Sequence, residues 1–268
     1  YTMMEFGKKT YIMGILNVTP DSFSDGGEFT NVDNAIKNAL EMVEQGADII
    51  DIGAESTRPG FIEVDADTEI KRLIPVIEAL KIKTNALISV DTYKSEVARK
   101  AMQSGADIIN DVWGFQKDTK MAEVAAEFNC LAVVMHNQTG TDYSIEIMQS
   151  IKDFFEKTIE IALKAGMKRN QLILDPGIGF GKTPEQNMYV MKRLEELKCF
   201  GLPILLGTSR KSMLGKILDL PPKERVEGTI ATTVMGIIQG VDIVRVHDVK
   251  ENLRAAMVTD AIYRKENQ

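Results

Sequence analysis

The chain has 268 residues, of which 44% are hydrophobic and 26% charged, an average composition that excludes a disordered or fibrous protein. Asp and Glu number 39 against 32 Lys and Arg, for a net charge of −7, so no basic surface for nucleic acid is expected. The sequence has no bilayer-spanning apolar run and no signal-peptide pattern. These features predict a cytoplasmic enzyme without nucleic-acid or membrane partners. Because the sequence begins at Tyr1, a processed leader stays an alternative.

Short apolar runs recur along the whole chain and predict strands. There are eight: Tyr11–Leu16, Asp48–Ile52, Ala86–Val90, Asp107–Ile109, Leu131–Met135, Gln171–Leu174, Pro203–Leu206 and Asp242–Val246. Continuous apolar runs, rather than apolar and polar residues in alternation, indicate strands that are buried on both faces. Such burial is typical of a parallel sheet covered by helices.

Amphipathic stretches lie between the apolar runs and predict helices. They are Val32–Gln45, Ala66–Leu80, Ser95–Ser104, Met121–Phe128, Ser144–Ala165, Pro184–Leu197, Lys223–Gln239 and Val249–Arg264. The sequence Gly-Ala-Asp-Ile-Ile at 46–50 returns at 105–109, and a close variant stands at 240–244, each where a helix ends and a strand begins. Eight strand–helix units favour a closed (β/α)8 TIM barrel over a doubly wound open sheet. No linker interrupts them, so a single domain over residues 1–268 is expected.

Polar residues follow nearly every predicted strand, which is where (β/α)8 barrels carry their binding residues. They are Asn17, Asp51, Glu55, Asp91, Asn110, Asp111, His136, Asn137, Asp175, Ser209, Arg210, Lys211, Arg245 and His247. Each one alone could be only a cap or turn residue. Together, the carboxylates, carboxamides and cations suit a flat heterocycle beside an anionic group. Arg245 and His247 share one face of a strand and could hold a phosphate.

Other kinds of site fit the sequence less well. Residues 177–182 match a dinucleotide fingerprint only in part, because the third glycine and an acidic partner are missing. Their glycines instead predict close approach of the backbone to a ligand, with Phe180 presenting its ring. No zinc motif or serine-nucleophile motif occurs. Mg²⁺ remains compatible with the sequence, because an ion held by Asn17 and substrate oxygens needs few protein ligands. Cys130 and Cys199 are predicted to be reduced core thiols.

Seven motifs connect the chain to a known family: MGILNVTPDSFSDGG, DIGAESTRPG, SVDTYKSEVA, ADIINDV, LILDPGIGFGK, LGTSRKS and VRVHDV. In these motifs, which span most of its length, the chain resembles the bacterial dihydropteroate synthases, which are pterin-binding enzymes. The resemblance implies a transferase that joins 6-hydroxymethyl-7,8-dihydropterin diphosphate to 4-aminobenzoate. The products would be 7,8-dihydropteroate, a folate precursor, and pyrophosphate. It also implies Mg²⁺ as cofactor, a homodimer, and inhibition by sulfonamides.

The resemblance also assigns roles to single residues. It implies a pterin site of Asp91, Asn110, Asp175 and Lys211, with Val112 and Met135 along the faces of the ring. It implies that Asn17, Arg245 and His247 hold the diphosphate, with Mg²⁺ at Asn17. The aminobenzoate site would comprise Phe23, Thr57, Pro59, Phe180 and Ser212, with the carboxylate at Ser212. Separately, we predict that Arg58, in the glycine-ended loop at 53–60, serves aminobenzoate use more than pterin binding. The catalytic set would be Asp91, Asp175, Lys211, Arg245 and His247.

Two other functions stay open on the sequence. A methyltetrahydrofolate-binding methyltransferase has a barrel similar at Asp91, Asn110 and Asp175, but it holds no diphosphate, and Arg245 and His247 therefore count against it. A non-catalytic pterin carrier would show the same binding residues and release no pyrophosphate. The polar, glycine-ended loops at 17–27 and 53–60 are predicted to be lids over the site.

Overall fold

Parallel strands alternate with helices along the entire computed structural model, which describes residues 4–19, 28–55 and 63–264, and the side chains of these except at 28–31. The strands are β1 (Tyr11–Asn17), β2 (Ile49–Gly53), β3 (Leu87–Asp91), β4 (Ile108–Asp111), β5 (Leu131–Met135), β6 (Leu172–Asp175), β7 (Leu205–Leu206) and β8 (Ile243–Val246). The first and last residues of each strand lie within two residues of the ends of a predicted apolar run. The eight strand predictions are confirmed.

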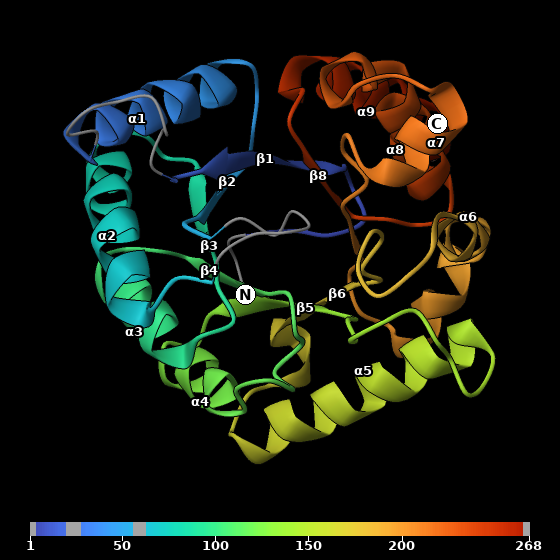
Figure 1. Cartoon of the computed structure of the whole chain (residues 1–268), viewed down its shortest axis with the longest axis horizontal. Coiled ribbons are helices and arrows are strands. Elements are labelled where there is room, and N and C mark those ends of the chain that lie inside the picture. The colour runs from blue at the N-terminus through green and yellow to red at the C-terminus, as the bar shows by residue number, and fades with distance from the viewer. Residues whose placement is uncertain (1–3, 20–27, 56–62, 265–268) are drawn as a thin grey trace.

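The strands close into a barrel, seen along its axis in Figure 1. Their order is β6-β5-β4-β3-β2-β1-β8-β7, and every pairing is parallel. Between β6 and β7 the contact is reduced to one bridge, Leu174 with Ile204, where the Leu174 N–H donates to the Pro203 carbonyl at 2.9 Å. This nearly closed ring confirms the (β/α)8 prediction and excludes the open sheet.

Helices surround the barrel. They are α1 (Glu28–Glu44), α2 (Ala66–Lys83), α3 (Ser95–Gln103), α4 (Lys120–Glu127), α5 (Ile147–Lys164), α6 (Pro184–Lys192), α7 (Ser212–Leu218), α8 (Val226–Ile238) and α9 (Val249–Tyr263). The predicted helix at 184–197 is divided, because α6 ends at Lys192 and the 3-10 turn η2 (Leu194–Phe200) follows. Two more 3-10 turns are η1 (Arg169–Gln171) and η3 (Pro222–Glu224). In the ranges that the structure describes, no helix has both the length and the apolarity to cross a membrane.

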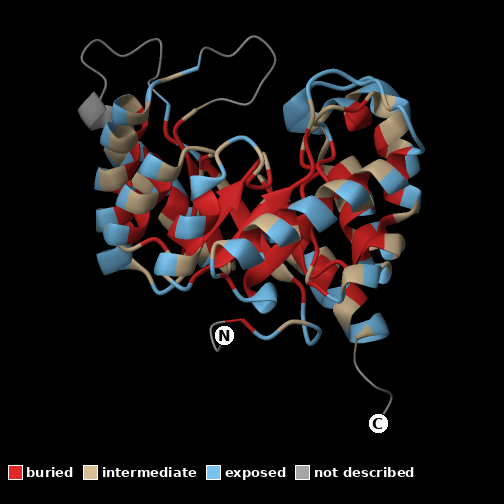
Figure 2. Cartoon of the chain, turned by 90° about the horizontal axis from the view of Figure 1, so that it is seen from below, coloured by how far each residue is buried: buried red, intermediate tan, exposed pale blue. Residues whose placement is uncertain are grey.

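Two apolar layers hold the fold together. The larger one lies between the strands and the inner faces of the helices, while the outer helix faces are exposed (Figure 2). The smaller one fills the inside of the barrel with buried side chains from every strand except β3: Met13, Ile49, Ile108, Leu131, Val133, Ile173, Leu205 and Ile243, joined by Met4. Burying these side chains stabilises the barrel by roughly 2 kcal/mol for each large aliphatic group.

One cysteine prediction is wrong. Cys130 is buried just before β5, as predicted, but Cys199 is exposed. It lies in η2, whose buried side chains are Leu194 and Leu197. Because a 3-10 helix repeats every three residues, Cys199 falls outside the inward-facing row.

Candidate active site

The polar site is built directly above the apolar layer in the barrel. Side chains two residues apart on a strand point to the same side, so Asp51 follows Ile49 inward, Asn110 follows Ile108, and Arg245 follows Ile243. A pocket opens at the carboxyl ends of the strands, lined by Asp91, Asn110, Val112, Met135, Asp175, Phe180, Gly207, Lys211 and Arg245. The six residues expected around a pterin thus lie together, with Phe180 and Arg245 beside them.

An arginine joins two carboxylates on one side of this pocket. The Arg245 Nε donates to Asp51 Oδ2 at 2.7 Å, and its Nη2 lies 3.5 Å from Asp91 Oδ2. Burial, reinforced by the negative charge of Asp51, raises the pKa of Asp91 to about 7, although Arg245 opposes this. Burial disfavours the Arg245 cation too, yet the two carboxylates keep the pKa of Arg245 above its ordinary value. The cation therefore stays charged and ready to meet an anion.

Asp51 is a site residue to which the sequence assigned no role. It is fully buried, and the same Oδ2 that binds Arg245 also accepts from Asn110 Nδ2 at 3.1 Å. The sequence placed it among the polar residues at this rim, and its position two residues beyond the inward-facing Ile49 is the signal that it points into the barrel. Within the described residues, Asp51 Oδ1 and Asn110 Oδ1 are buried without a hydrogen-bond partner. An unsatisfied buried acceptor is costly, and a ligand with N–H groups would relieve that cost at Asn110.

Asp175 and Lys211 enter the pocket from the end of β6 and from the segment that follows β7. Asp175 is 6% exposed, and its Oδ1 accepts from the Gly177 N–H at 2.9 Å. The Lys211 Nζ donates to the Ile178 carbonyl at 2.5 Å and lies 4.9 Å from the centroid of the Phe180 ring. Burial raises the pKa of Asp175, with Lys211 opposing, and burial lowers the pKa of Lys211 to about 8. The pocket therefore offers an acceptor and a donor on one side.

Ser209 orients His247 at the end of β8. Its Oγ accepts from the His247 backbone N–H at 3.0 Å and lies 2.7 Å from His247 Nδ1. Where the hydroxyl donates its proton to Nδ1, the His247 ring carries its own proton on Nε2. Asn17 is exposed at the end of β1, the strand that pairs with β8. Asn17, Arg245 and His247 thus come from two adjacent strands.

The remaining expected residues divide into two groups. Ser212 is exposed at the first position of α7, next to Lys211. Phe23, Thr57, Arg58 and Pro59, and with them most of both predicted lids, lie outside the described residues.

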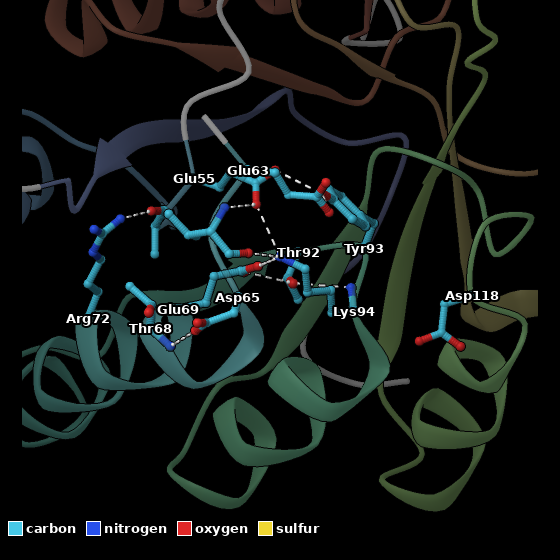
Figure 3. A network of polar contacts seen from close by, with 12 residues as sticks. Glu55, Glu63, Asp65, Thr68, Glu69, Arg72, Thr92, Tyr93, Lys94 and Asp118 are labelled. Carbon is cyan, nitrogen blue, oxygen red and sulfur yellow. Dashed lines mark hydrogen bonds and ion pairs between the residues drawn. The ribbon is translucent and has the colours of Figure 1, made fainter. Parts of the chain in front are cut away.

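A polar network holds the residues after β2 against those after β3 (Figure 3). Glu55 accepts from the Tyr93 hydroxyl at 2.8 Å, from Lys94 Nζ at 3.1 Å and from the Val64 N–H at 3.3 Å. Lys94 Nζ also donates to the Val64 carbonyl at 2.6 Å and forms an ion pair with Glu69. Residues 55 and 64 are thereby both attached to the segment that directly follows Asp91.

We expect Lys94→Met to destabilise the fold by about 3 kcal/mol, because it removes one partner of a buried ion pair. Glu69 is only 2% exposed, and burial already raises its pKa against the effect of Lys94. Urea unfolding measures the loss. Lys100→Met, on the exposed side of α3, is the matched control. Equal free energies of unfolding for the two variants would show that the network contributes nothing to stability.

The fold and the pocket together are typical of barrel enzymes that bind a nitrogen heterocycle. Comparison with known proteins supports the same class. The family model of pterin binding enzymes matches residues 13–247. The chain therefore belongs to the pterin binding enzyme family.

The similar proteins define the branch of that family. A dihydropteroate synthase of Clostridium beijerinckii is 55% identical over 260 residues, which cover 97% of this chain and 96% of the relative. The crystal structure of a Clostridium difficile dihydropteroate synthase in the presence of pteroic acid is 61% identical, with a TM-score of 0.95 over 98% of this chain and 100% of that one. The Xanthomonas albilineans dihydropteroate synthase with 4-aminobenzoic acid is 38% identical, with a TM-score of 0.91 over 96% of this chain and 94% of that one. Within the family, the chain stands among the dihydropteroate synthases.

Proposed function

We infer that this chain catalyses the dihydropteroate synthase reaction. It joins 6-hydroxymethyl-7,8-dihydropterin diphosphate to 4-aminobenzoate and releases pyrophosphate and 7,8-dihydropteroate, a step of folate synthesis. The observation that carries the inference is the pocket itself, where Asp91, Asn110, Asp175 and Lys211 converge beside Arg245 in a chain with these relatives. Sulfonamides, as mimics of aminobenzoate, are the expected inhibitors.

The chemistry of the pocket supports pterin binding. The guanidine-like edge of a pterin presents N–H donors, which the carboxylates of Asp91 and Asp175 and the unsatisfied Oδ1 of Asn110 can accept. The ring carbonyl and a ring nitrogen need a donor, which Lys211 can supply. Val112 and Met135 line the same pocket and would contact the faces of the ring.

We place the diphosphate at Arg245, His247 and Asn17. Arg245 supplies a permanent cation, and His247 supplies an Nε2–H donor when the Ser209 hydroxyl donates to its Nδ1. Mg²⁺ fits this arrangement, because it keeps several waters and binds through substrate phosphates with few protein ligands. The described residues contain no cluster of three or more acidic, His or Cys side chains that would hold an ion by itself, so Asn17 is the proposed protein ligand. When bound, Mg²⁺ would neutralise part of the charge on the departing diphosphate.

We place aminobenzoate between Phe180 and Ser212, at the edge of the pterin pocket. Ser212 begins α7 directly after Lys211 and could bind the carboxylate, while the Phe180 ring would contact the aromatic ring. Phe23, Thr57, Arg58 and Pro59 complete this proposed site. Their part in it rests on the sequence motifs alone.

In the mechanism that we propose, the bond between the exocyclic methylene carbon and the diphosphate breaks before the amine attacks. The electron-rich dihydropterin shares the resulting positive charge, and the carboxylates of Asp91 and Asp175 stabilise it. Arg245 and His247 stabilise the leaving group. The neutral arylamine then attacks the carbon and loses a proton, so no strong general base is needed. Water must stay out, because it would capture the same cation.

A pyrophosphate-release assay with and without 4-aminobenzoate tests the function. We expect release with both substrates and Mg²⁺ present, and dihydropteroate in equal amount. A pterin carrier would release no pyrophosphate, and a methyltransferase would instead transfer methyl groups from methyltetrahydrofolate to a corrinoid. Either result would overturn the proposal.

The pH dependence of the reaction should report Asp91. Because the pKa of Asp91 is raised to about 7, the carboxylate is lost as the pH falls through that value. The protonated form accepts a pterin N–H less well, so we expect kcat/KM for the pterin diphosphate to decrease on the acid side. Initial rates from about pH 5.5 to 9 measure this. An acid limb that is unchanged in Asp91→Asn would assign the titration to another group.

We also propose that the enzyme is a cytoplasmic homodimer. Helices α8 and α9 pack against each other. Their outer faces carry apolar side chains that are 47% to 68% exposed: Met235, Ile238, Met257, Val258 and Ile262. Neighbouring apolar side chains of this size are typical of an interface. The free thiols of Cys130 and Cys199 suit a reducing compartment. Sedimentation tests the dimer, and cell fractionation tests the location.

A further inference from the structure

Lys182 is a buried cation with no role in the reaction described so far. It ends the loop between β6 and α6 and is 7% exposed. Its ammonium contacts His136 Nδ1 at 2.8 Å and donates to the carbonyls of Gly177 at 3.0 Å and Phe180 at 3.1 Å. All three acceptors are neutral. Burying an ammonium among neutral groups costs free energy. We therefore expect this charge to have a function at its position.

The first use is to shape the loop from Gly177 to Gly181. The chain winds around the ammonium with positive φ at its glycines, +75° at Gly177 and +60° at Gly181, and a Cβ at Gly177 would stand 2.0 Å from the His136 carbonyl oxygen. Two carbonyls turn toward Lys182, and the Ile178 carbonyl between them binds Lys211. Lys182 thus fixes the acceptor that orients Lys211 in the pterin pocket.

The second use is electrostatic. Asp175 meets the positive charges of Lys211, Arg245 and Lys182, all of which oppose the rise in its pKa that burial causes. Lys182 itself is influenced by Asp175 and Lys211, and burial lowers its pKa to about 7. Burial together with the nearby Lys182 cation depresses the pKa of His136 to about 2. The imidazole therefore stays neutral and acts as an acceptor.

We propose that Lys182 is a positioning residue for the pterin site, which holds the loop between β6 and α6 in place and keeps the negative charge on Asp175. The proposal deepens the proposed function and rests on it. Lys182 does not line the pocket and acts through the Ile178 carbonyl and through Asp175. Loss of the ammonium should therefore change how pterin binding depends on pH, and should not only weaken it.

The test is Lys182→Met, which preserves length and apolar volume and removes the charge. Calorimetry with 6-hydroxymethylpterin, which needs no turnover, gives the affinity at each pH. Because Asp91 also titrates on the acid side, the comparison is made in an Asp91→Asn background. There we expect Lys182→Met to shift the onset of the acid-side loss of affinity about one pH unit higher, the scale of one nearby charge. The exposed Lys192→Met on α6 is the matched control. A purely structural role would lower the affinity equally at every pH and would overturn the proposal.

Two more variants keep the test decisive. In an Asp175→Asn background, Lys182→Met should leave the acid limb where it is, because the group it acts on is gone. His136→Phe keeps an aromatic ring against Phe154 but removes one acceptor of the Lys182 ammonium. It should therefore shift the acid limb in the same direction as Lys182→Met, by a smaller amount. This variant can be measured even if Lys182→Met does not fold. An unmoved limb in His136→Phe would overturn the proposal. Pyrophosphate release by the unmodified enzyme is measured separately, so a failure there would refute the function and not this role.

Discussion

Arg245→Gln is expected to lower kcat by about 10²- to 10³-fold, the effect of losing one preorganised group that stabilises charge in a transition state. The guanidinium is held between Asp51 and Asp91 at the place proposed for the leaving diphosphate. Glutamine keeps a donor but carries no charge, so the negative charge on the departing group and the two carboxylates would all lack a partner. Single-turnover measurement of pyrophosphate release reports the chemical step directly.

A control variant separates this effect from a general loss of positive charge. Arg254→Gln changes the net charge equally, but Arg254 is exposed on α9, and its kcat should be unaffected. Arg245→Gln should also lower the affinity for 6-hydroxymethylpterin, which has no diphosphate, by a smaller factor than it lowers kcat. If the two arginine variants turned over at the same rate, Arg245 would have no part in leaving-group departure.

Asp175→Asn should weaken pterin binding by about 10²-fold, which corresponds to loss of a buried hydrogen bond to a charged group. The amide can still accept the Gly177 N–H through its oxygen, so the loop keeps its attachment. Its NH2 group, however, would face the N–H donors of the ligand, and Lys211 would lose its strongest negative neighbour. Calorimetry with 6-hydroxymethylpterin measures the affinity without requiring turnover.

The matched control for Asp175 lies at the other end of the barrel. Asp242 precedes β8, is 3% exposed, and accepts the Ile204 N–H at 3.0 Å. Asp242→Asn therefore replaces a buried carboxylate of similar surroundings at the opposite rim. We expect it to lower the free energy of unfolding and to leave pterin affinity unchanged. A comparable loss of affinity in both variants would mean that Asp175 acts only through the stability of the barrel.

Strand positions were well predicted because burial on both faces demands continuous apolar runs, such as Leu131–Met135, which β5 matches at both ends. Helix ends were less certain. The pattern at 184–197 continues past Lys192 even though the helix does not, because the apolar spacing of a 3-10 turn differs little from that of an α-helix over a few residues. The wrong prediction for Cys199 has a different origin, because its burial was expected only from the general preference of free cysteine for the core.

The members of the candidate site were predictable where a motif carried them, and less so where a role depends on a contact. Asp91, Asn110, Asp175 and Lys211 follow strands and lie in recognisable motifs. Asp51 lies within β2, but its link to Arg245, nearly two hundred residues away along the chain, depends on the closure of the barrel. Lys182 ends a glycine-rich motif whose glycines suggested approach to a ligand, and only the structure shows that the carbonyl of one of them, Gly177, accepts from the lysine itself.

By itself, the order of apolar runs and polar residues determined that this is a barrel with its chemistry at one rim, since strand burial and the two-residue period are local properties of the chain. Only the tertiary structure decided which charges meet. The neutralisation of Asp51 and Asp91 by one arginine, and the enclosure of an ammonium by three neutral acceptors, depend on distances between segments far apart in the chain. Electrostatic energy varies with those distances and with burial, and neither quantity is written in the order of the residues.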